Sequence, residues 1–596
     1  MQAGPSGSSQ SDSEAILPSF LAILRSSSPI SIPTQTLLGA ITHYLSTLQR
    51  PLLTELVETI STSSSLWNSP GIPLEEIRNA IRVSVPTKIA LIEDETKEVY
   101  FAQSRKRRRA RIWLKDVLNP INDVESCETR LQYLVSLLEG VSDVSNVDWG
   151  AERVRLEEEV VLGLADALDR ESSSGMMMLY VAMPNIDVSR LSALDMAELS
   201  PRIHSSLVEL VKFKSGQKLQ KEAPIISRAL ARSFDVLEHG GPTSQHNAWE
   251  TMRSFCMEIR GVGEALEKEC NGHVEATQWD GHKTAFFSFL LPASAILDLS
   301  LRDKGNSAWE INGLPRSADM AIQLLLALAS FSYLTDVSSG GFENYHRVLY
   351  GNLDILAAHG GTTGVDELFR EVTNGRTMTD ARAAFVLLLG DELVHQLGSR
   401  CVDTLLPLAE KHAHRPEHRA SFEAAHAFLL SLLGSASKTL DTTIPQADFF
   451  DSLISQHLHI LTKQAKRGGI TSDQIKQAFP LVVEAASRRS PSSVQLCVDY
   501  LKNLPDSQER KLIQVIIAPH MPAGELSEYL DSLARVIMST PKDSEERLEL
   551  ARRAFEMVIK DMGDDVKEIG VEWWMKWRSE FEGRSGSDQG FARSRL

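Results

Sequence analysis

The sequence is poor in cysteine, in aromatic residues and in long apolar runs. Among its 596 residues are five cysteines, and the closest two, Cys256 and Cys270, lie 14 positions apart. This spacing excludes a CxxC metal or redox pair and fits buried free thiols in a reducing compartment. Aromatic residues make up only 6%. Leu, Ala and Glu dominate instead of β-branched runs, which favours helix.

Basic residues are fewer than acidic residues, so the formal net charge is -17. An acidic surface repels phosphate, so we expect no nucleic-acid partner. Residues Met1–Glu14 lack the basic and apolar parts of a secretory signal. The most apolar stretches, near Phe286–Leu299 and Ala321–Ser332, are shorter than the roughly 20 residues that a membrane span needs. The composition therefore predicts a soluble or peripheral protein.

No catalytic motif is evident. The chain lacks HExxH, a G-x-S-x-G elbow, a P-loop and a dinucleotide fingerprint. His414 and His418 have the i, i+4 spacing of a metal pair, but Pro416 between them disfavours a helix there. We therefore expect no catalytic residue, no cofactor and no metal.

Helical periodicity recurs along almost the whole chain. Within Thr34–Leu48, for example, Leu37, Ile41 and Leu45 fall on one helical face. Pairs of such segments recur irregularly, about every 30–50 residues, without a fixed repeat. The pattern predicts an all-α fold, an irregular α-solenoid of stacked helical hairpins with no sizeable sheet.

Signals for helix starts, helix ends and turns divide this array into segments. We expect a helix at Pro73–Val85, and a strand-like piece at Lys88–Phe101 that forms a hairpin or an exposed loop. Asp473 and Gln474 behind Thr471 and Ser472 resemble a helix start. The predicted organisation is a disordered N-terminus (1–13), an N-terminal helical array (14–270), a C-terminal helical array (271–582) and a flexible tail (583–596).

The carboxyl terminus carries the most specific motif. Residues Gly583–Gly590 form a polar linker, and the chain ends in Ser594, Arg595 and Leu596. Ser-Lys-Leu is the peroxisomal address, and arginine for lysine keeps the positive charge. A receptor groove captures the free carboxylate, with a cation at Arg595 and an apolar side chain at Leu596. The ending predicts entry into the peroxisome.

Two further clusters are candidates for partner or membrane contact. The first is basic, and three interpretations remain open for it: a solvated or partner-docking segment, a nuclear import signal, or contact with anionic lipid. The second is aromatic, and either docks a terminal helix on the last hairpin or anchors a partner. The residues of these clusters are Arg105, Lys106, Arg107, Arg108 and Arg109, followed by Arg111, and Trp573 and Trp577, with Trp574 between them.

The chain resembles the fungal intraperoxisomal peroxin eight family (peroxisomal biogenesis factor eight). Beside the terminal address, three segments carry the likeness: Leu37–Trp67 (LLGAITHYLSTLQRPLLTELVETISTSSSLW), Met176–Leu194 (MMMLYVAMPNIDVSRLSAL) and Ala327–Ala358 (ALASFSYLTDVSSGGFENYHRVLYGNLDILAA).

This resemblance implies a non-enzymatic role in matrix protein import, peripheral on the lumenal face of the peroxisomal membrane. The implied partners are the docking subcomplex, the RING-finger ubiquitin-ligase subcomplex and the receptor for the carboxyl-terminal address, with a part in cargo release. Two alternatives remain open at this point. One is another peroxisomal matrix protein, including an enzyme without recognisable motifs. The other is a nuclear or cytosolic helical scaffold that uses the basic run at residues 105–111.

Overall fold

The fold was examined in a computed structural model of the chain. The structure describes residues 8–26, 30, 32–69, 71–97, 101–123, 127–171, 173–213, 216–270, 274–275, 278–303, 310–311, 313–335, 343–374, 378–435 and 446–581. The chain divides into two compact units, which are described separately. Unit 1 comprises Met1–Val262 and Ala276–Arg302, and unit 2 comprises Gly263–Glu275 and Asp303–Leu596.

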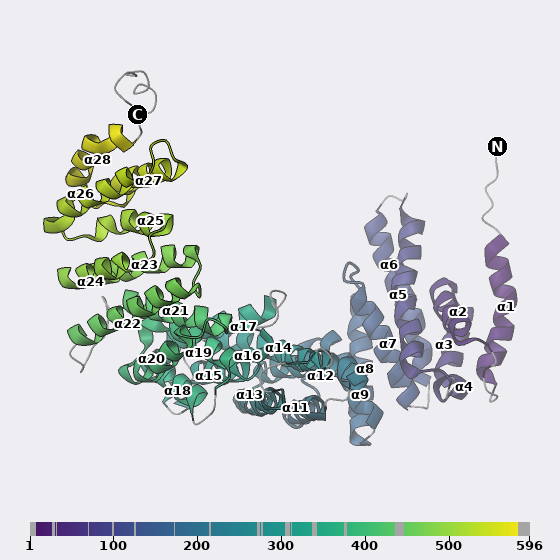
Figure 1. Cartoon of the computed structure of the whole chain (residues 1–596). Helices are drawn as coiled ribbons and strands as arrows, with labels where there is room; N and C mark the ends of the chain where they lie inside the picture. The colour runs from purple at the N-terminus through teal and green to yellow at the C-terminus, as the bar shows by residue number, and fades with distance from the viewer. Residues whose placement is uncertain are drawn as a thin grey trace, which may run out of the picture. The chain divides into compact units, whose positions relative to one another are not determined.

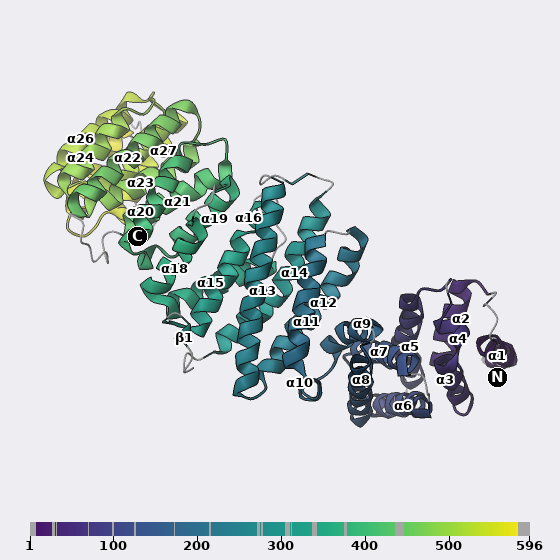
Figure 2. The same ribbon diagram turned by 90° about the horizontal axis from the view of Figure 1, so that it is seen from below.

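Unit 1 consists of helices that pack mainly on neighbours one to three positions away in sequence, as in stacked hairpins. Figure 2 shows α11, α12 and α14 side by side. The elements are α1 (Ser8–Arg25), α2 (Thr34–Thr47), α3 (Leu52–Thr62), α4 (Ser64–Trp67), α5 (Leu74–Thr96), α6 (Ala102–Leu118), η1 (Asn119–Asp123), α7 (Cys127–Asp143), α8 (Ala151–Asp169), α9 (Ser173–Ala182), η2 (Met183–Asn185), α10 (Val188–Leu191), α11 (Met196–Phe213), α12 (Gly216–Glu238) and α14 (Trp279–Arg302).

Unit 2 continues in the same manner, and Figure 1 shows α22 to α28 as a stack. Of the long helix α13 (Pro242–Glu269), residues up to Val262 are assigned to unit 1 and residues from Gly263 to unit 2. The elements of unit 2 are β1 (Glu310–Ile311), β2 (Leu314–Pro315), α15 (Arg316–Ala329), α16 (Ser332–Thr335), α17 (Glu343–Ile355), η3 (Leu356–Gly360), α18 (Gly361–Thr373), α19 (Asp380–Glu392), η4 (Val394–Gln396), α20 (Ser399–Ala413), α21 (Arg419–Ser435), α22 (Gln446–Arg467), α23 (Ser472–Ser487), α24 (Pro491–Lys502), α25 (Gln508–Ile517), η5 (Ala518–His520), α26 (Ala523–Ser539), α27 (Glu545–Glu556), η6 (Met557–Asp561) and α28 (Lys567–Phe581).

The predicted fold class is confirmed: the chain is an α-solenoid. In the described part of the chain, strands occur only as the two-residue antiparallel pair β1–β2. Helix starts are encoded locally, as at α23, where Thr471 accepts from the backbone N–H of Gln474 and Gln474 accepts from that of Thr471. This is a capping box. Pro416 lies between the end of α20 and the start of α21, as predicted.

The predicted strand-like piece at Lys88–Phe101 is wrong, because α5 continues to Thr96 through Pro86. The described residues of that piece extend the buried face of the helix with helical spacing, and this burial outweighs the proline. The buried positions that define this face are Ile77, Ile81, Val85, Ile89, Ile92 and Thr96. They pack against α2 and α7.

The predicted boundaries differ from the structure at helices α1 and α14. Helix α1 begins at Ser8, inside the segment 1–13 that the sequence predicts to be disordered. Helix α14 belongs to unit 1, whereas the sequence analysis assigned residues 271–582 to the second array. The tail, residues 583–596, lies outside the described residues.

Helix α14 is longer than the apolar stretch Phe286–Leu299 suggested. It has 24 residues and, by length and composition alone, is able to cross a membrane. Its apolar residues, among them Phe286, Phe289 and Ile296, are however buried within unit 1, where α14 packs on α12. The prediction that no apolar stretch is long enough to span a membrane is therefore wrong for α14. In the structure, α14 is a core helix of unit 1.

Candidate interaction sites

The predicted peroxisomal address lies beyond the last described helix. Helix α28 ends at Phe581, and Ser594, Arg595 and Leu596 lie outside the described residues. Their role therefore remains a prediction from the sequence.

The basic run forms part of a single helix, α6, and the fold divides it into paired and free residues. The Lys106 side chain is buried, and its ammonium pairs with the Glu93 carboxylate of α5. Arg109 pairs with Glu95, which is also on α5. Arg111 Nη2 lies 2.6 Å from Asp148 Oδ2. Lys106 therefore holds α6 against α5 and is closed to any partner.

The exposed side of α6 remains basic. Arg105 and Arg108 are exposed and make no hydrogen bond or ion pair with any described residue. Arg105, Arg108, Arg109 and Ile112 follow the i, i+3, i+4, i+7 spacing of one helical face. Ile112 is 48% exposed on that face. We call these four residues the α6 basic face.

The tryptophans of α28 are part of the last hairpin. Trp573 is buried, and its ring lies 5.6 Å from that of Phe581. The Trp577 Nε1 lies 3.4 Å from Asp531 Oδ1 on α26. Trp574 packs its ring 5.2 Å from Phe555 of α27. These contacts agree with the interpretation that the terminal helix docks on the last hairpin. A partner contact through Trp573 would require α28 to separate from its neighbours.

The histidines of unit 2 form two buried contacts. His426 on α21 and His457 on α22 face one another, and burial lowers the pKa of His426 to about 4 and that of His457 to about 3. The buried His412 lies 3.6 Å from Asp380, which also contacts His418 at 3.0 Å. Across the described ranges, no group of three or more His, Cys, Asp or Glu side chains is arranged to hold a metal ion.

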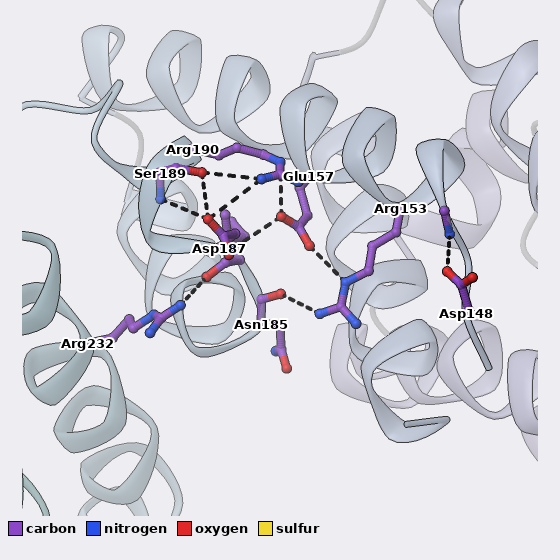
Figure 3. Close-up of polar contacts among 10 residues, drawn as sticks. Asp148, Arg153, Glu157, Asn185, Asp187, Ser189, Arg190 and Arg232 are labelled. Atoms are coloured by element: carbon purple, nitrogen blue, oxygen red, sulfur yellow. Dashed lines mark hydrogen bonds and ion pairs between the residues drawn. The ribbon is translucent and has the colours of Figure 1, made fainter. Parts of the chain in front are cut away.

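A site that the sequence analysis missed surrounds Glu157 in unit 1 (Figure 3). The Glu157 carboxylate is buried on α8. It accepts a 2.8 Å hydrogen bond from Arg153 Nε, and Arg190 Nε lies 3.1 Å from its other oxygen. The backbone N–H of Asp187 donates to the same carboxylate at 3.1 Å. A buried carboxylate with three such partners is fully compensated.

The segment from Pro184 to Arg190 is held in place by these contacts. Arg232 on α12 donates to the Ile186 carbonyl at 2.7 Å, and Arg153 donates to the Asn185 carbonyl at 3.3 Å. Asp187 caps α10 by accepting from the Ser189 hydroxyl and backbone N–H, which lowers the pKa of Asp187. Figure 3 shows the arginines converging on this segment from two sides.

These residues line a cleft of about 430 Å³, which we call the Trp149 cleft. It is bounded by the turn before α8, by α8 itself, by the Pro184–Arg190 segment and by Arg232. The sequence signals were Asp187 followed by Ser189, which resembles a cap, and the resemblance segment Met176–Leu194. Neither signal reveals that Arg153, Arg232 and Trp149 meet there.

Comparison with known protein families identifies one module in the chain. Residues 362–434 match the model of the PEX8 central TPR-like domain. The match covers most of α18 and all of α19, α20 and α21 up to residue 434. It begins four positions after the resemblance segment Ala327–Ala358, and none of the three resemblance segments lies inside it.

Solved structures with related chain traces include Kap121p bound to Ste12p and importin beta in an ammonium sulfate condition. The first has 10% identity and a TM-score of 0.22, and the match covers 98% of this chain and 77% of that chain. The second has 9% identity and a TM-score of 0.21, with 97% and 70% covered. At these TM-scores, neither match supports an argument about function. No curated protein matches the sequence.

The stacked hairpins place the chain among the helical-repeat proteins. Within that class, residues 362–434 carry the central TPR-like module of the PEX8 family, in agreement with the resemblance found in the sequence. This module implies a non-enzymatic peroxin with a role in peroxisomal import.

Proposed function

We propose that this protein is a scaffold for matrix protein import at the lumenal face of the peroxisomal membrane. In this role it links the docking subcomplex to the RING-finger ubiquitin-ligase subcomplex, contacts the receptor for the carboxyl-terminal address, and assists cargo release. The observation that carries the proposal is the PEX8 TPR-like module at residues 362–434. The Ser-Arg-Leu ending supports the location, and the helical array offers long surfaces for several partners.

The test is loss of the chain in a cell that needs peroxisomes for growth on fatty acids. We expect many fluorescent matrix cargoes to stay in the cytosol together, because an import factor acts on all of them. If import of unrelated cargo persists and only one metabolic step fails, the protein is a different matrix protein. A tagged version with a free carboxyl terminus should colocalise with a peroxisomal membrane marker.

We further propose that the α6 basic face provides the peripheral membrane contact. Arg105 and Arg108 are exposed and unpaired among the described residues, and Ile112 adds an exposed apolar group one turn beyond Arg108 on the same face. Basic residues near an anionic surface each contribute about 1 kcal/mol, so losing two should weaken vesicle binding about thirtyfold. The matched control removes two exposed arginines elsewhere in unit 1, Arg170 at the C-cap of α8 and Arg202 on α11.

The measurement is sedimentation of the full chain with phosphatidylserine-containing and phosphatidylcholine-only vesicles. Arg105→Ala with Arg108→Ala should lose binding to the anionic vesicles, and Arg170→Ala with Arg202→Ala should keep it. Equal loss in both double variants would mean that overall charge, rather than this face, drives binding.

The fold argues against the nuclear alternative. Within residues 105–111, Lys106 is buried and Arg109 and Arg111 are ion-paired in a packed helix. Reading this run as a linear signal would require α6 to leave its neighbours. A chain with Arg105→Ala and Arg108→Ala should therefore show the same localisation pattern with respect to the nucleus as the wild type.

A further inference from the structure

We propose that a cleft of unit 2, bounded by α20, α22 and α24, binds an acidic polypeptide segment of a partner through the carboxylates of that segment. The cleft has a volume of about 540 Å³, and we call it the His414 cleft. The proposal goes beyond the import scaffold role and does not depend on it, because it assigns a ligand chemistry to one surface and is tested on the purified chain.

The cationic side chains at this cleft are accessible and close together. Lys411, His414 and His459 line the cleft and are exposed. The pKa of His414 is lowered first by partial burial and then by the positive charges of Lys463, His459 and Arg467, so these groups lie near it. None of the five side chains makes a hydrogen bond or ion pair with a described residue. A ligand therefore reaches them without displacing any internal contact.

Acidic groups do not balance these cations. Among the described residues that line the cleft, Glu410 is the one acid, and it is also the one acid that acts on His414. Lys411, Lys463 and Arg467 carry three positive charges against the one negative charge of Glu410, which leaves a net charge of about +2 near pH 7. The whole chain, in contrast, has a net charge of -17. The cleft therefore attracts an anionic ligand at short range.

The length of the cationic row favours an elongated ligand over a single anion. His459, Lys463 and Arg467 follow one another at one-turn intervals along α22, and this row is about 12 Å long at about 1.5 Å per residue. Lys411 lines the same cleft from α20. A phosphate-sized anion contacts only part of the row, whereas the carboxylates of an extended segment recur about every 3.3 Å and reach along it. A planar lipid surface does not enter a concave cleft.

Neutral groups of the cleft suit the side chains of such a segment. The Tyr500 side chain on α24 is half-buried, and its hydroxyl has no hydrogen-bond partner among the described residues. This hydroxyl is able to donate to a carboxylate. Pro407 is exposed at the wall and offers an apolar surface to the methylene groups of a glutamate side chain. Charge, length and surface thus agree on an acidic polypeptide.

The experiment is fluorescence anisotropy of the full chain with a fluorescein-labelled oligoglutamate peptide of about eight residues. Oligoglutamine and oligolysine peptides of equal length serve as comparison probes. We expect oligoglutamate to bind at least about tenfold more tightly than either. Its affinity should fall at least about tenfold between about 0.05 M and about 0.5 M salt, because exposed charges are screened.

The first variant removes two cations of the row, Lys463→Gln with Arg467→Gln. Oligoglutamate affinity should fall about fivefold to tenfold, because two exposed ion pairs with the ligand are lost. The control, Lys542→Gln with Arg578→Gln, removes the same charge at two exposed positions elsewhere in unit 2. The control should bind oligoglutamate as the wild type does.

The second variant reverses the charge of the row, Lys463→Glu with Arg467→Glu. This chain should lose oligoglutamate binding and bind oligolysine instead. A misfolded chain binds neither peptide specifically, so the reversal of selectivity separates recognition from unfolding. The thermal midpoint from circular dichroism should stay near that of the wild type, since both positions lack internal ion pairs in the described part of the chain.

Four outcomes would overturn the proposal. Oligoglutamate binding no tighter than that of oligoglutamine would mean that the cations are only solvated. Complete displacement of oligoglutamate by about 10 mM inorganic phosphate at constant ionic strength would assign the cleft to a small anion, and displacement by phosphatidylserine vesicles would assign it to lipid. Equal losses in the Gln double variant and its control would assign binding to overall charge. None of these outcomes bears on the import role, which cargo localisation tests separately.

Discussion

The Nδ1 atom of His426 lies 3.1 Å from the Nε2 atom of His457, inside unit 2. One ring nitrogen must donate to the other, so the contact requires at least one neutral ring. The remaining nitrogens, His426 Nε2 and His457 Nδ1, have no partner among the described residues. Burial therefore acts on an isolated pair and lowers the pKa of both rings.

This pair predicts a loss of stability at mildly acidic pH. An unfolded histidine has a pKa near 6.5, whereas the folded values are about 4 and about 3. Below pH 6.5 the unfolded state binds protons that the folded state refuses, so stability falls as pH falls. Between pH 6.5 and 5, the free energy of unfolding should fall by up to about 1.4 kcal/mol per pH unit for each histidine.

Chemical denaturation at a series of pH values tests this slope. His426→Leu with His457→Leu should flatten it, whereas the control His395→Leu, at an exposed position, should not. An unchanged slope in the double variant would assign the pH dependence to other groups.

A second prediction concerns the close packing of α7 on α5. Pro86 has no N–H, so the Arg82 carbonyl lacks its helical partner, and Gly140 of α7 approaches it. A Cβ at residue 140 would lie 2.5 Å from the Arg82 carbonyl oxygen. Gly140→Ala should therefore destabilise the protein by about 1–2 kcal/mol, despite the better helix propensity of alanine.

Gly39 in α2 provides the matched control for this substitution. A Cβ there would meet nothing within 4 Å, so Gly39→Ala should stabilise by about 0.5–1 kcal/mol. Urea unfolding followed by circular dichroism compares the two variants. Equal effects of the same sign would contradict the packing argument.

A third prediction concerns a buried ion pair beside the family module. Arg382 Nη2 of α19 lies 2.5 Å from Glu267 Oε2 of α13, with both side chains under a tenth exposed. Thr379 donates to the same carboxylate at 2.6 Å. Arg382→Met removes the ion-pair partner of a buried carboxylate and should cost about 3–5 kcal/mol.

Removing both charges distinguishes the attraction within the ion pair from the cost of burying an unpaired charge. Arg382→Met combined with Glu267→Leu should recover most of the lost stability, because the buried charge is gone. The control Arg488→Met breaks an exposed pair with Glu484 and should cost at most about 1 kcal/mol. Additive losses in the double variant, measured by denaturation, would show that the two side chains act independently.

The fourth prediction concerns the terminal address. Deleting Ser594–Leu596, or changing Leu596 to Asp, should weaken binding to the import receptor about a hundredfold or more, because a charge enters an apolar pocket. Arg595→Glu should weaken binding nearly as much. Arg595→Lys should be tolerated if the receptor recognises the positive charge at this position. Labelled terminal peptides and the purified receptor provide the measurement.

Localisation of the full chain should be measured for the same variants. Organelle entry should fall less than peptide binding if the protein also contacts the receptor elsewhere. Gln589→Ala in the linker is the control and should change neither. If the wild-type terminal peptide shows no carboxylate-dependent binding to the receptor, the prediction of a peroxisomal address is wrong. The match of residues 362–434 to the family module would not be affected.

Local patterns in the sequence predicted the features that depend on neighbours within a few residues. The capping box of Thr471 and Gln474, the break at Pro416 and the helical faces all involve contacts within about one turn. The strand-like prediction at Lys88–Phe101 was wrong because Pro86 and the acidic residues obscured a buried helical face that continues through them to Thr96. The likeness to the PEX8 family was also accessible from the sequence, although the matched module lies elsewhere.

By itself, the sequence determined the all-α class, the helix starts, the family and the terminal motif, because each is written in adjacent or closely spaced residues. Only the tertiary structure decided that Lys106 is buried while Arg105 and Arg108 are exposed, and that Trp149, Glu157 and Arg232 share one cleft. These relationships join residues up to about eighty positions apart. They depend on how helices pack, which the hydrophobic pattern of any single helix does not specify.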